Sequence, residues 1–534
     1  MGPRVAAWAA RGGAIVAGLA AAFAHPPFGL LPGLFGYAGL LWLCDQAAPA
    51  RPIRSAFFRG WLTGVAYFTV STWWVAEAFY VDAKDQAWMA PFAVALLAMG
   101  LALFWGVAAA LYRALAPAGA RCLLVFAGAL TGCEWLRGHL FTGFPWDLPG
   151  ETWRAGSALS QTASLVGAYG LTWLTLAIAA APGLGWRGRD AKIALAGAAV
   201  VLASLYGFGA WRLAHALTTP AANAPLVRIV QPDTAETDSQ APDAFAHALE
   251  RNLDLTRLPA ARAPDVIIWS EQGLPAALGD YLAPGTWSEA AITAALRPGQ
   301  TLITGGYRTA PAPPGAYAPD GVLYFNSLVA LQRTAAGVTL SAVYDKHRLA
   351  PFGEYLPLGR YLAPLGVQQL VHVGQGFTPG PTPRPITSPG VPAFQPLICY
   401  ESLFPGFTRQ GARLAAHRPA WIVNISDDAW FGVTSGPWQH LNLASYRAIE
   451  EGLPMMRATP TGVSAAIDAY GRSLQSKLLG ERRYGVIDAV LPPSLPPTGF
   501  VRFGAAPFIA MLLVSLGVLY RRGNATLRRN SNVM

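Results

Sequence analysis

Three residues of types that support nucleophilic catalysis stand at the ends of short apolar segments in the second half of the sequence. Cys399 follows the run "QPLI", Glu271 ends "DVIIWSE", and Lys346 lies in "VYDKHRL". A thiol has a reference pKa near about 8.5, so it attacks at neutral pH only with a base or a positive charge beside it. Glu271 is a candidate base for Cys399, and Lys346 is a candidate donor to the oxyanion of a tetrahedral intermediate.

The same residue types are also common in purely structural roles. A free cysteine is among the most buried residue types and often serves as a small hydrophobic side chain. Glu271 and Lys346 would then be ordinary surface charges. A Cys/His pair is a further alternative, with His347 or His440 as the base. If Lys346 and His347 lie on extended chain, their side chains point to opposite faces, so both cannot approach Cys399. Spacing alone leaves these alternatives open.

The elements that would position these residues lie between residues 222 and 500, where short apolar runs alternate with charges and turn residues. The strand candidates are β-branched and bounded by Gly, Pro or Asp. They are residues 226–231, 265–271, 301–307, 323–331, 397–402, 420–426, 462–468 and 484–490. Helices are expected at residues 243–258, 288–296 and 439–452. This alternation predicts an α/β or layered α-β-β-α domain, in which residues that end neighbouring strands can converge at one sheet edge.

The composition places this domain in a membrane protein. Of the 534 residues, 53% are hydrophobic and 13% are charged, whereas roughly 25% are charged in an ordinary soluble domain. Apolar runs lie at residues 12–44, 56–80, 88–112, 120–136, 158–182, 191–211 and 504–520. Since about 20 apolar residues span a bilayer, and "HPPFG" divides the first run, we expect about eight transmembrane helices.

The expected domain organisation follows from these runs. It comprises a membrane domain at 1–215, a globular domain at 222–495, a C-terminal transmembrane helix at 500–522 and a tail at 523–534. The basic residues behind the net charge of +10 gather at the termini and in every second loop. The positive-inside rule therefore predicts cytoplasmic termini and an external globular domain, and nucleic acid is not an expected partner.

The N-terminus has a second interpretation. Arg4, Arg11 and the small residues of "AFAH" resemble a signal peptide with its cleavage site. Another apolar run follows at once, so we expect an uncleaved helix.

No metal or cofactor is expected. The histidines of the globular domain are scattered without ligand spacing; they are His247, His347, His372, His417 and His440. No Gly-rich phosphate loop follows a strand. No coiled-coil seam is visible, so we expect a monomer.

Four longer segments carry a family resemblance through their order and spacing. They are "WSEQGLP" from 269, "YDKHRLAPFGEYLP" from 344, "ICYESLFP" from 398 and "NISDDAWFGVTSGPWQHLNLASYRAIEEGLPMMRATPTG" from 424. The chain resembles the apolipoprotein N-acyltransferases, the membrane-bound branch of the nitrilase superfamily. "GFPW", from 143, extends the resemblance into the helical part.

This resemblance implies a fold and a set of site residues. The fold is a polytopic α-helical membrane domain plus an extracytoplasmic nitrilase-like α-β-β-α sandwich. Glu271, Lys346 and Cys399 match the family's Glu-Lys-Cys triad. Supporting positions of the family match Glu354, Tyr400 and Glu401. Each supporting residue has a simpler alternative: Tyr400 as a core aromatic, and the two glutamates as structural acceptors that hold a loop or Lys346.

The sequence also departs from the family pattern. Where the family often has Q-x-N-I-x-Q followed shortly by tryptophan, this chain reads "QPDTAETDSQAPDAF" over residues 231–245, without tryptophan. Asp427 and Pro460 stand where asparagine is common. The local hydrogen bonds and the tryptophan's contribution to lipid handling are therefore expected to differ.

The activity implied by the resemblance is acyl transfer through a Cys399 thioester. A membrane phospholipid would donate its sn-1 acyl chain, and the acceptor would be the α-amino group of the diacylglyceryl-cysteine of an apolipoprotein. The implied location is the bacterial inner membrane with the catalytic domain in the periplasm. Lipid-contact candidates are Leu358, Leu362, Trp430 and Trp438, for which packing around the site is the alternative.

Two other classes of protein fit parts of the sequence. A membrane-anchored amidase of the nitrilase type would use the same triad with water as acceptor, but one anchor would suffice for it. A transporter or receptor would use its external domain for binding alone. Its path would be marked by intramembrane charges such as Glu77 and Glu134, which lie near predicted helix ends where charge is tolerated.

Overall fold

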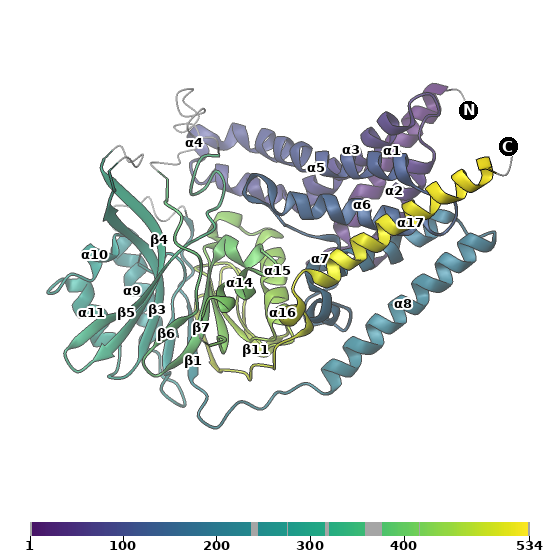
Figure 1. Cartoon of the computed structure of the whole chain (residues 1–534). Helices are drawn as coiled ribbons and strands as arrows, with labels where there is room; N and C mark the ends of the chain where they lie inside the picture. Colours follow the sequence, from purple (N-terminus) through teal and green to yellow (C-terminus); the bar gives the residue numbers. More distant parts are fainter. Residues whose placement is uncertain are drawn as a thin grey trace. The chain divides into compact units, whose positions relative to one another are not determined.

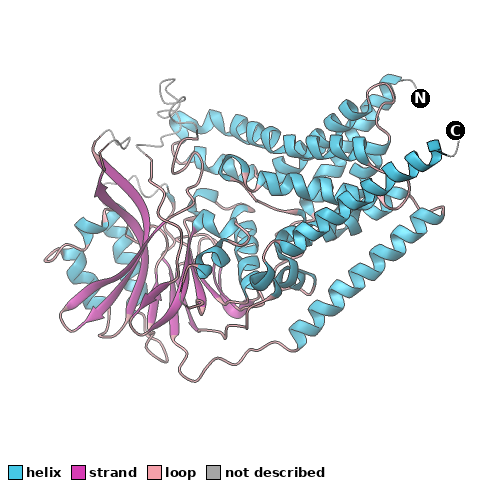
Figure 2. Ribbon diagram, viewed as in Figure 1, coloured by secondary structure: helices cyan, strands magenta, loops and turns pink. Residues whose placement is uncertain are grey.

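The computed structural model describes residues 3–236, 244–274, 276–314, 320–357, 376–415 and 417–531. The chain divides into two compact units. The helical unit comprises Met1–Ala216, Trp438–Glu450 and Pro497–Met534, and the sandwich unit comprises Leu217–Pro437 and Glu451–Pro496. The strands all fall in the sandwich unit (Figure 2).

The helical unit is built from helices of different lengths (Figure 1). They are α1 (Pro3–Phe23), α2 (Phe35–Asp45), α3 (Pro52–Ser71), α5 (Ala90–Leu115), α6 (Cys122–Arg137), α7 (Ala163–Ala180), α8 (Arg189–Ala214), α15 (Gly436–Glu451), α16 (Gly499–Phe503) and α17 (Ala506–Ser531), with the short α4 (Ala83–Gln86) before α5. Large apolar side chains on α8, including Ile193, Val200 and Trp211, are exposed. Such a surface is suited to lipid rather than water.

Among the described residues, four helical segments are long and apolar enough to cross a membrane. They are Val5–Phe23, Ala83–Leu115, Leu159–Leu184 and Arg189–Ala214. The helix at Ala506–Leu519 is apolar but shorter. α2 has 11 residues and α6 has 16, fewer than the about 20 that span a bilayer. The total of about eight spans therefore stays a prediction.

Small residues allow close helix packing in this unit. A Cβ added at Gly60 of α3 would meet Ala109 and the backbone of Trp105 on α5. The Trp105 ring packs against Tyr67, with ring centroids 4.7 Å apart. Gly60 thus lets the backbones of α3 and α5 approach closely, and the rings of Tyr67 and Trp105 pack together at the same contact.

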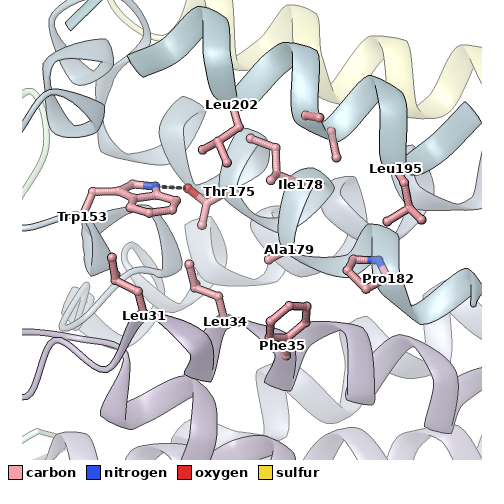
Figure 3. A pocket seen from close by; sticks show the side chains of 12 residues that line it. Leu31, Leu34, Phe35, Trp153, Thr175, Ile178, Ala179, Pro182, Leu195 and Leu202 are labelled. Atoms are coloured by element: carbon pink, nitrogen blue, oxygen red, sulfur yellow. Dashed lines mark hydrogen bonds between the residues drawn. The ribbon is translucent and has the colours of Figure 1, made fainter. Parts of the chain in front are cut away.

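An apolar pocket of about 270 Å³ lies within the helical unit (Figure 3). Side chains from α2, α7, α8 and the segments just before α2 and around Trp153 line it. The indole N–H of Trp153 donates a hydrogen bond to Thr175 Oγ1 over 2.8 Å, as Figure 3 shows. The pocket is separate from Glu271, Lys346 and Cys399, which belong to the sandwich unit.

One helix of the helical unit comes from the middle of the region expected for the globular domain. Residues 438–450 of α15 cluster with the apolar helices. Tyr446 and Ile449 of α15 are fully buried against Trp153. The chain therefore leaves the sandwich unit after residue 437 and returns at residue 451.

Buried charges hold α15 in place. Arg447 lies 3.2 Å from Glu151 Oε1 and 3.1 Å from Glu450 Oε2, and all three side chains are at most 1% exposed. Glu450 also accepts a hydrogen bond of 2.8 Å from the backbone N–H of Ala168. A buried arginine between two carboxylates specifies this arrangement, because either partner left alone would be a buried, uncompensated charge.

The sandwich unit contains two six-stranded sheets. The first has the order β12-β1-β2-β3-β4-β5, with β1 (Leu226–Gln231), β2 (Val266–Ile268), β3 (Thr301–Pro311), β4 (Val322–Thr334), β5 (Gly337–Asp345) and β12 (Gly485–Val490). The second has the order β11-β10-β9-β8-β7-β6, with β6 (Ile386–Ser388), β7 (Val391–Ile398), β8 (Trp421–Ile425), β9 (Met455–Ala458), β10 (Ser464–Ile467) and β11 (Ser473–Leu479). β1, β2 and β3 are parallel in the first sheet, as are β7, β8 and β9 in the second.

The two sheets share one core. Ile229 and Ile268 of the first sheet are buried together with Ile398 and Val423 of the second. Helices α9 (Ala244–Arg257) and α11 (Trp287–Ala295) pack on the other face of the first sheet, where Trp269 is buried. The short α10 (Leu278–Tyr281) lies beside β3, and α14 (Phe407–Arg413) beside β7. This layering confirms the expected sandwich.

The predicted strands largely correspond to observed ones, with one informative difference. The candidate at 226–231 is β1, residue for residue, whereas the candidate at 397–402 ends at Ile398, where a 3-10 helix, Cys399–Leu403, begins. The candidate at 265–271 likewise ends at Ile268. In both places the chain leaves its sheet just before a candidate catalytic residue, Glu271 or Cys399. These side chains therefore stand at the end of a strand rather than inside the sheet.

Candidate active site

The three residues singled out from the sequence come together at one edge of the sandwich unit. Glu271 follows β2, Lys346 follows β5 and Cys399 follows β7. β2 and β7 belong to the parallel parts of their sheets. The carboxyl ends of parallel strands leave a crevice in which side chains from separate strands can meet.

Cys399 stands at a sharp turn between a strand and a 3-10 helix. Its backbone φ is 44°, in the left-handed region that non-glycine residues rarely occupy. The thiol is hydrogen-bonded to the side chain of Ser426, which follows β8. Cys399 is partly exposed. This backbone geometry lifts the thiol out of the strand and toward the residues that follow β2 and β5.

Lys346 is a buried ammonium held by two carboxylates. Its Nζ lies 3.1 Å from Glu271 Oε1 and 2.9 Å from Glu354 Oε2, and its side chain is 2% exposed. Burial by itself would lower the pKa of Lys346, but the charges of Glu271 and Glu354 outweigh it and raise that pKa well above its ordinary value. Lys346 is therefore a fixed cation next to Cys399.

Asn326 completes the arrangement of the two carboxylates. Its Nδ2 donates to Glu271 Oε1 over 2.7 Å and to Glu354 Oε1 over 2.6 Å. The backbone N–H of Ala350 donates to the other oxygen of Glu354 over 2.7 Å. These donors keep two negative side chains close together around one lysine, because each oxygen has a partner.

Glu401 links the turn after Cys399 to the loop that carries Lys346. Its Oε1 accepts hydrogen bonds from the Tyr344 hydroxyl at 2.7 Å and from the backbone N–H groups of His347 at 2.8 Å and Arg348 at 3.1 Å. Its Oε2 accepts from the backbone N–H of Ile398 at 2.9 Å. Burial, the largest effect, raises the pKa of Glu401 to about 7, while the four donors that converge on the carboxylate act in the opposite direction.

The protonation of the thiol follows from its surroundings. Desolvation and the negative charge of Glu271 raise the pKa of Cys399, while Lys346 acts in the opposite direction. The resting residue is consequently a thiol rather than a thiolate. Nucleophilic attack then requires a base that removes the proton as the new bond forms, and Glu271 faces the same lysine.

Comparisons with known proteins give the family. Residues 17–181 match the N-terminal domain of apolipoprotein N-acyltransferase, and residues 226–495 match the carbon-nitrogen hydrolase family. An apolipoprotein N-acyltransferase of Caulobacter vibrioides is 53% identical over 96% of this chain and 95% of its own. The chain belongs to the apolipoprotein N-acyltransferase family.

A second relative and a solved structure are similar as well. The apolipoprotein N-acyltransferase of Bradyrhizobium diazoefficiens is 38% identical over 95% of this chain and 93% of its own. An amidase from Nesterenkonia sp. has 16% identity and a TM-score of 0.35, covering 55% of this chain and 97% of the amidase. Membership of the apolipoprotein N-acyltransferase family rests on the family matches and on the two relatives.

The rival base candidates of the sequence have other contacts. The Nδ1 atom of His347 is 2.9 Å from the carbonyl oxygen of Gly380. His440 belongs to the helical unit, where its ring contacts Trp146. Among the base candidates named from the sequence, Glu271 is the one that forms an ion pair with Lys346 beside Cys399.

The remaining predicted positions are dispersed. Tyr400 is buried with its ring against Phe404. Trp430, in the sandwich unit, is 40% exposed, and Trp438, in the helical unit, is half-buried. Leu358 and Leu362 lie outside the described residues.

Sequence reasoning did not predict two of the contacts to the candidate triad. Asn326 is a polar residue at a buried position of β4, and a buried amide needs partners, which was a usable signal. The backbone N–H of Asp427 donates to Glu271 Oε2 over 2.8 Å. This backbone contact had no side-chain signal, because any residue at 427 except proline carries the same donor.

Proposed function

We propose that this chain transfers an acyl chain from a membrane phospholipid to the N-terminus of apolipoproteins, through a thioester on Cys399. The observation that carries the proposal is the buried Lys346, ion-paired to Glu271 and Glu354 next to a thiol at the end of β7. Family membership supplies the substrate class.

In the first half-reaction, Glu271 takes the proton of Cys399 as the sulfur attacks the sn-1 ester carbonyl of the phospholipid. Lys346 and backbone N–H groups stabilise the oxyanion. The carbon–oxygen bond to glycerol then breaks, the proton on Glu271 passes to the departing oxygen, and lysophospholipid leaves. The enzyme retains the acyl group as a thioester.

In the second half-reaction, the α-amino group of the diacylglyceryl-cysteine attacks the thioester carbonyl. Glu271 accepts a proton from the attacking nitrogen, the carbon–sulfur bond breaks, and the proton passes from Glu271 to the departing sulfur, which restores the thiol. The product is the N-acylated lipoprotein. Ping-pong kinetics follow from the covalent intermediate.

We further propose the setting expected from the sequence. The helices cross the bacterial inner membrane about eight times, both termini are cytoplasmic, and the sandwich unit is periplasmic. The protein works as a monomer. Moving a two-chain lipid out of the bilayer costs about 0.8 kcal/mol for each methylene exposed to water, so apolar side chains must cover the acyl chains near the site. We propose that these lipid contacts come from Leu358, Leu362, Trp430 and Trp438.

The thioester is tested directly by mass. Purified protein is incubated with a phospholipid of defined acyl chains and no acceptor, and its intact mass is measured before and after neutral hydroxylamine. We expect a hydroxylamine-labile gain of one acyl chain. The gain should be absent in Cys399→Ala and present in Cys44→Ala, a buried cysteine of the helical unit. No adduct on folded wild-type protein contradicts the proposal and favours the amidase alternative.

A further inference from the structure

A second carboxylate contact lies beside Glu271 and plays no part in the scheme above. Asp427 follows β8, and its Oδ2 accepts a hydrogen bond of 2.6 Å from Nε2 of Gln272, the neighbour of Glu271. Its own backbone N–H donates to Glu271 Oε2 over 2.8 Å. Asp427 thus holds two consecutive residues of the turn after β2, one of them the candidate base.

Glu236 also contacts the side chain of Asp427. Its carboxyl is hydrogen-bonded to the side chains of Asp427 and Gln272, and the residue is half-buried. Two carboxylates cannot hydrogen-bond to each other without a proton between them. The contact between Glu236 and Asp427 therefore defines a carboxylic acid–carboxylate pair.

Both carboxyls also take part in other hydrogen bonds. Oδ2 of Asp427 accepts from Gln272 and its Oδ1 accepts from the backbone N–H of Ala429 at 3.2 Å, while Glu236 is hydrogen-bonded to Gln272 as well. The single proton therefore lies between the two carboxyls and belongs to the pair. An acid pair has a proton to lose, whereas two amides at the same positions would have none.

We propose that Glu236 and Asp427 share one proton and act as positioning residues for Glu271, holding the Asp427 N–H on its carboxylate as long as the proton is present. When the proton leaves, the two carboxylates repel each other and the contact to Glu271 opens. The proposal deepens the acyl-transfer function and rests on Glu271 as the base.

The surrounding charges agree with a retained proton. Burial and the neighbouring carboxylates raise the pKa values of Glu236 and Asp427 above the ordinary carboxyl range. The charged groups that face the pair are Glu271 and Asp428. Asp428 is itself ion-paired to Arg457 at 2.7 Å, so it supplies no proton to the pair.

Loss of this proton predicts an alkaline limit to activity. The rate at which Cys399 is acylated should fall about tenfold per pH unit once the pair ionises. Titration of Lys346 or of Cys399 does not explain such a fall. The pKa of Lys346 is raised, so its proton leaves at higher pH, and ionisation of Cys399 would increase its reactivity rather than decrease it.

The decisive variant is Glu236→Gln. An amide donates to Asp427 as the neutral acid does, but it cannot ionise. We expect the alkaline fall to disappear in Glu236→Gln and in Asp427→Asn, and to persist in Glu250→Gln, an exposed carboxyl on α9. The rate is measured twice, by acylation from a defined phospholipid and by alkylation of Cys399 with iodoacetamide; for alkylation the ratio of the wild-type rate to that of Glu236→Gln is followed across pH, because ionisation of the thiol raises both rates alike. Alkylation needs no acyl transfer, so failure of the proposed acyl-transfer function can be told apart from failure of the shared-proton proposal.

A spectroscopic test addresses the proton itself in the resting, full-length protein. Infrared spectra at neutral pH should contain a protonated carboxyl carbonyl band that both Glu236→Gln and Asp427→Asn remove and Glu250→Gln leaves unchanged. A purely structural contact would move neither the band nor the alkaline limit. An alkaline limit shared by wild type and Glu236→Gln, or a band that neither substitution changes, overturns the proposal.

Discussion

At the level of single residues, the site contains two buried carboxylates but only one ammonium to pair with them. Glu271 and Glu354 are both buried around one ammonium, that of Lys346. The amide of Asn326 supplies the missing donors to both carboxylates. A base held by fixed donors is positioned before the substrate arrives, which is the condition for efficient proton transfer.

Glu401 provides a test of positioning that is independent of the base. In Glu401→Gln, the introduced NH₂ group must face at least one of the donors that now point at the carboxylate, and one buried N–H then loses its acceptor. The loop of Lys346 should shift relative to Cys399. We expect acylation of Cys399 to slow roughly hundredfold, as misplacement by about 1 Å does. The initial rate of adduct formation measures this.

The control for this substitution is Tyr344→Phe. It removes one donor to Glu401 and leaves the three backbone donors in place. Its rate should be much closer to wild type. Equal rates for wild type and Glu401→Gln, with both proteins folded, would show that Glu401 does not position the site.

At the level of secondary structure, the helices of the helical unit depend on positions without side chains. Gly209 of α8 lies against the backbone of Ala158, and a Cβ at this position would overlap the Ala158 carbonyl oxygen. A Cβ added at Gly207, on the same helix, would have no neighbouring atom within 4 Å. Two glycines of α8 therefore have different reasons to be present.

Alanine substitutions separate these two glycines. Gly209→Ala should destabilise the protein by about 1–3 kcal/mol, because backbone atoms cannot move aside as side chains do. Gly207→Ala should be neutral or stabilise by up to about 1 kcal/mol, since alanine favours helix. Thermal unfolding of the purified proteins in one detergent measures both. Equal midpoints would contradict the close approach of α8 to Ala158.

At the level of the whole chain, the domain organisation does not follow the order of the sequence. The carbon-nitrogen hydrolase family matches residues 226–495 as one stretch, yet residues 438–450 cluster with the apolar helices. Tyr446 and Arg447 are buried there against Gly150 and Glu151, which precede the sandwich unit in the chain. Within residues 226–495 the chain therefore passes from the sandwich unit to the helical unit and back again.

Arg447→Met tests this organisation. The substitution keeps an unbranched apolar stem but removes the guanidinium, so Glu151 and Glu450 stay buried without their cation. We expect a loss of about 3–5 kcal/mol in the free energy of unfolding. Amide hydrogen exchange should rise in α15 and in the segment around Glu151 first. Arg472→Met, which breaks a partly exposed pair with Asp468, is the matched control and should cost less.

The sequence by itself determined the family, the sandwich and the identity of the residues that meet at the site. These features are local: β-branched runs end at polar residues, and the motifs around Glu271, Lys346 and Cys399 are continuous in the chain. A strand that ends before a polar residue presents it at a sheet edge, whichever strand is its neighbour.

Only the tertiary structure decided which partners those residues have. Asn326 lies between Glu271 and Glu354, and Glu236 reaches Asp427 from a distant part of the sequence. Such contacts depend on the order of strands in two sheets, for which the spacing of residues carries no information. The same holds for α15, whose amphipathic pattern predicts a helix but not the unit it joins, because burial of an apolar face is satisfied by any complementary surface.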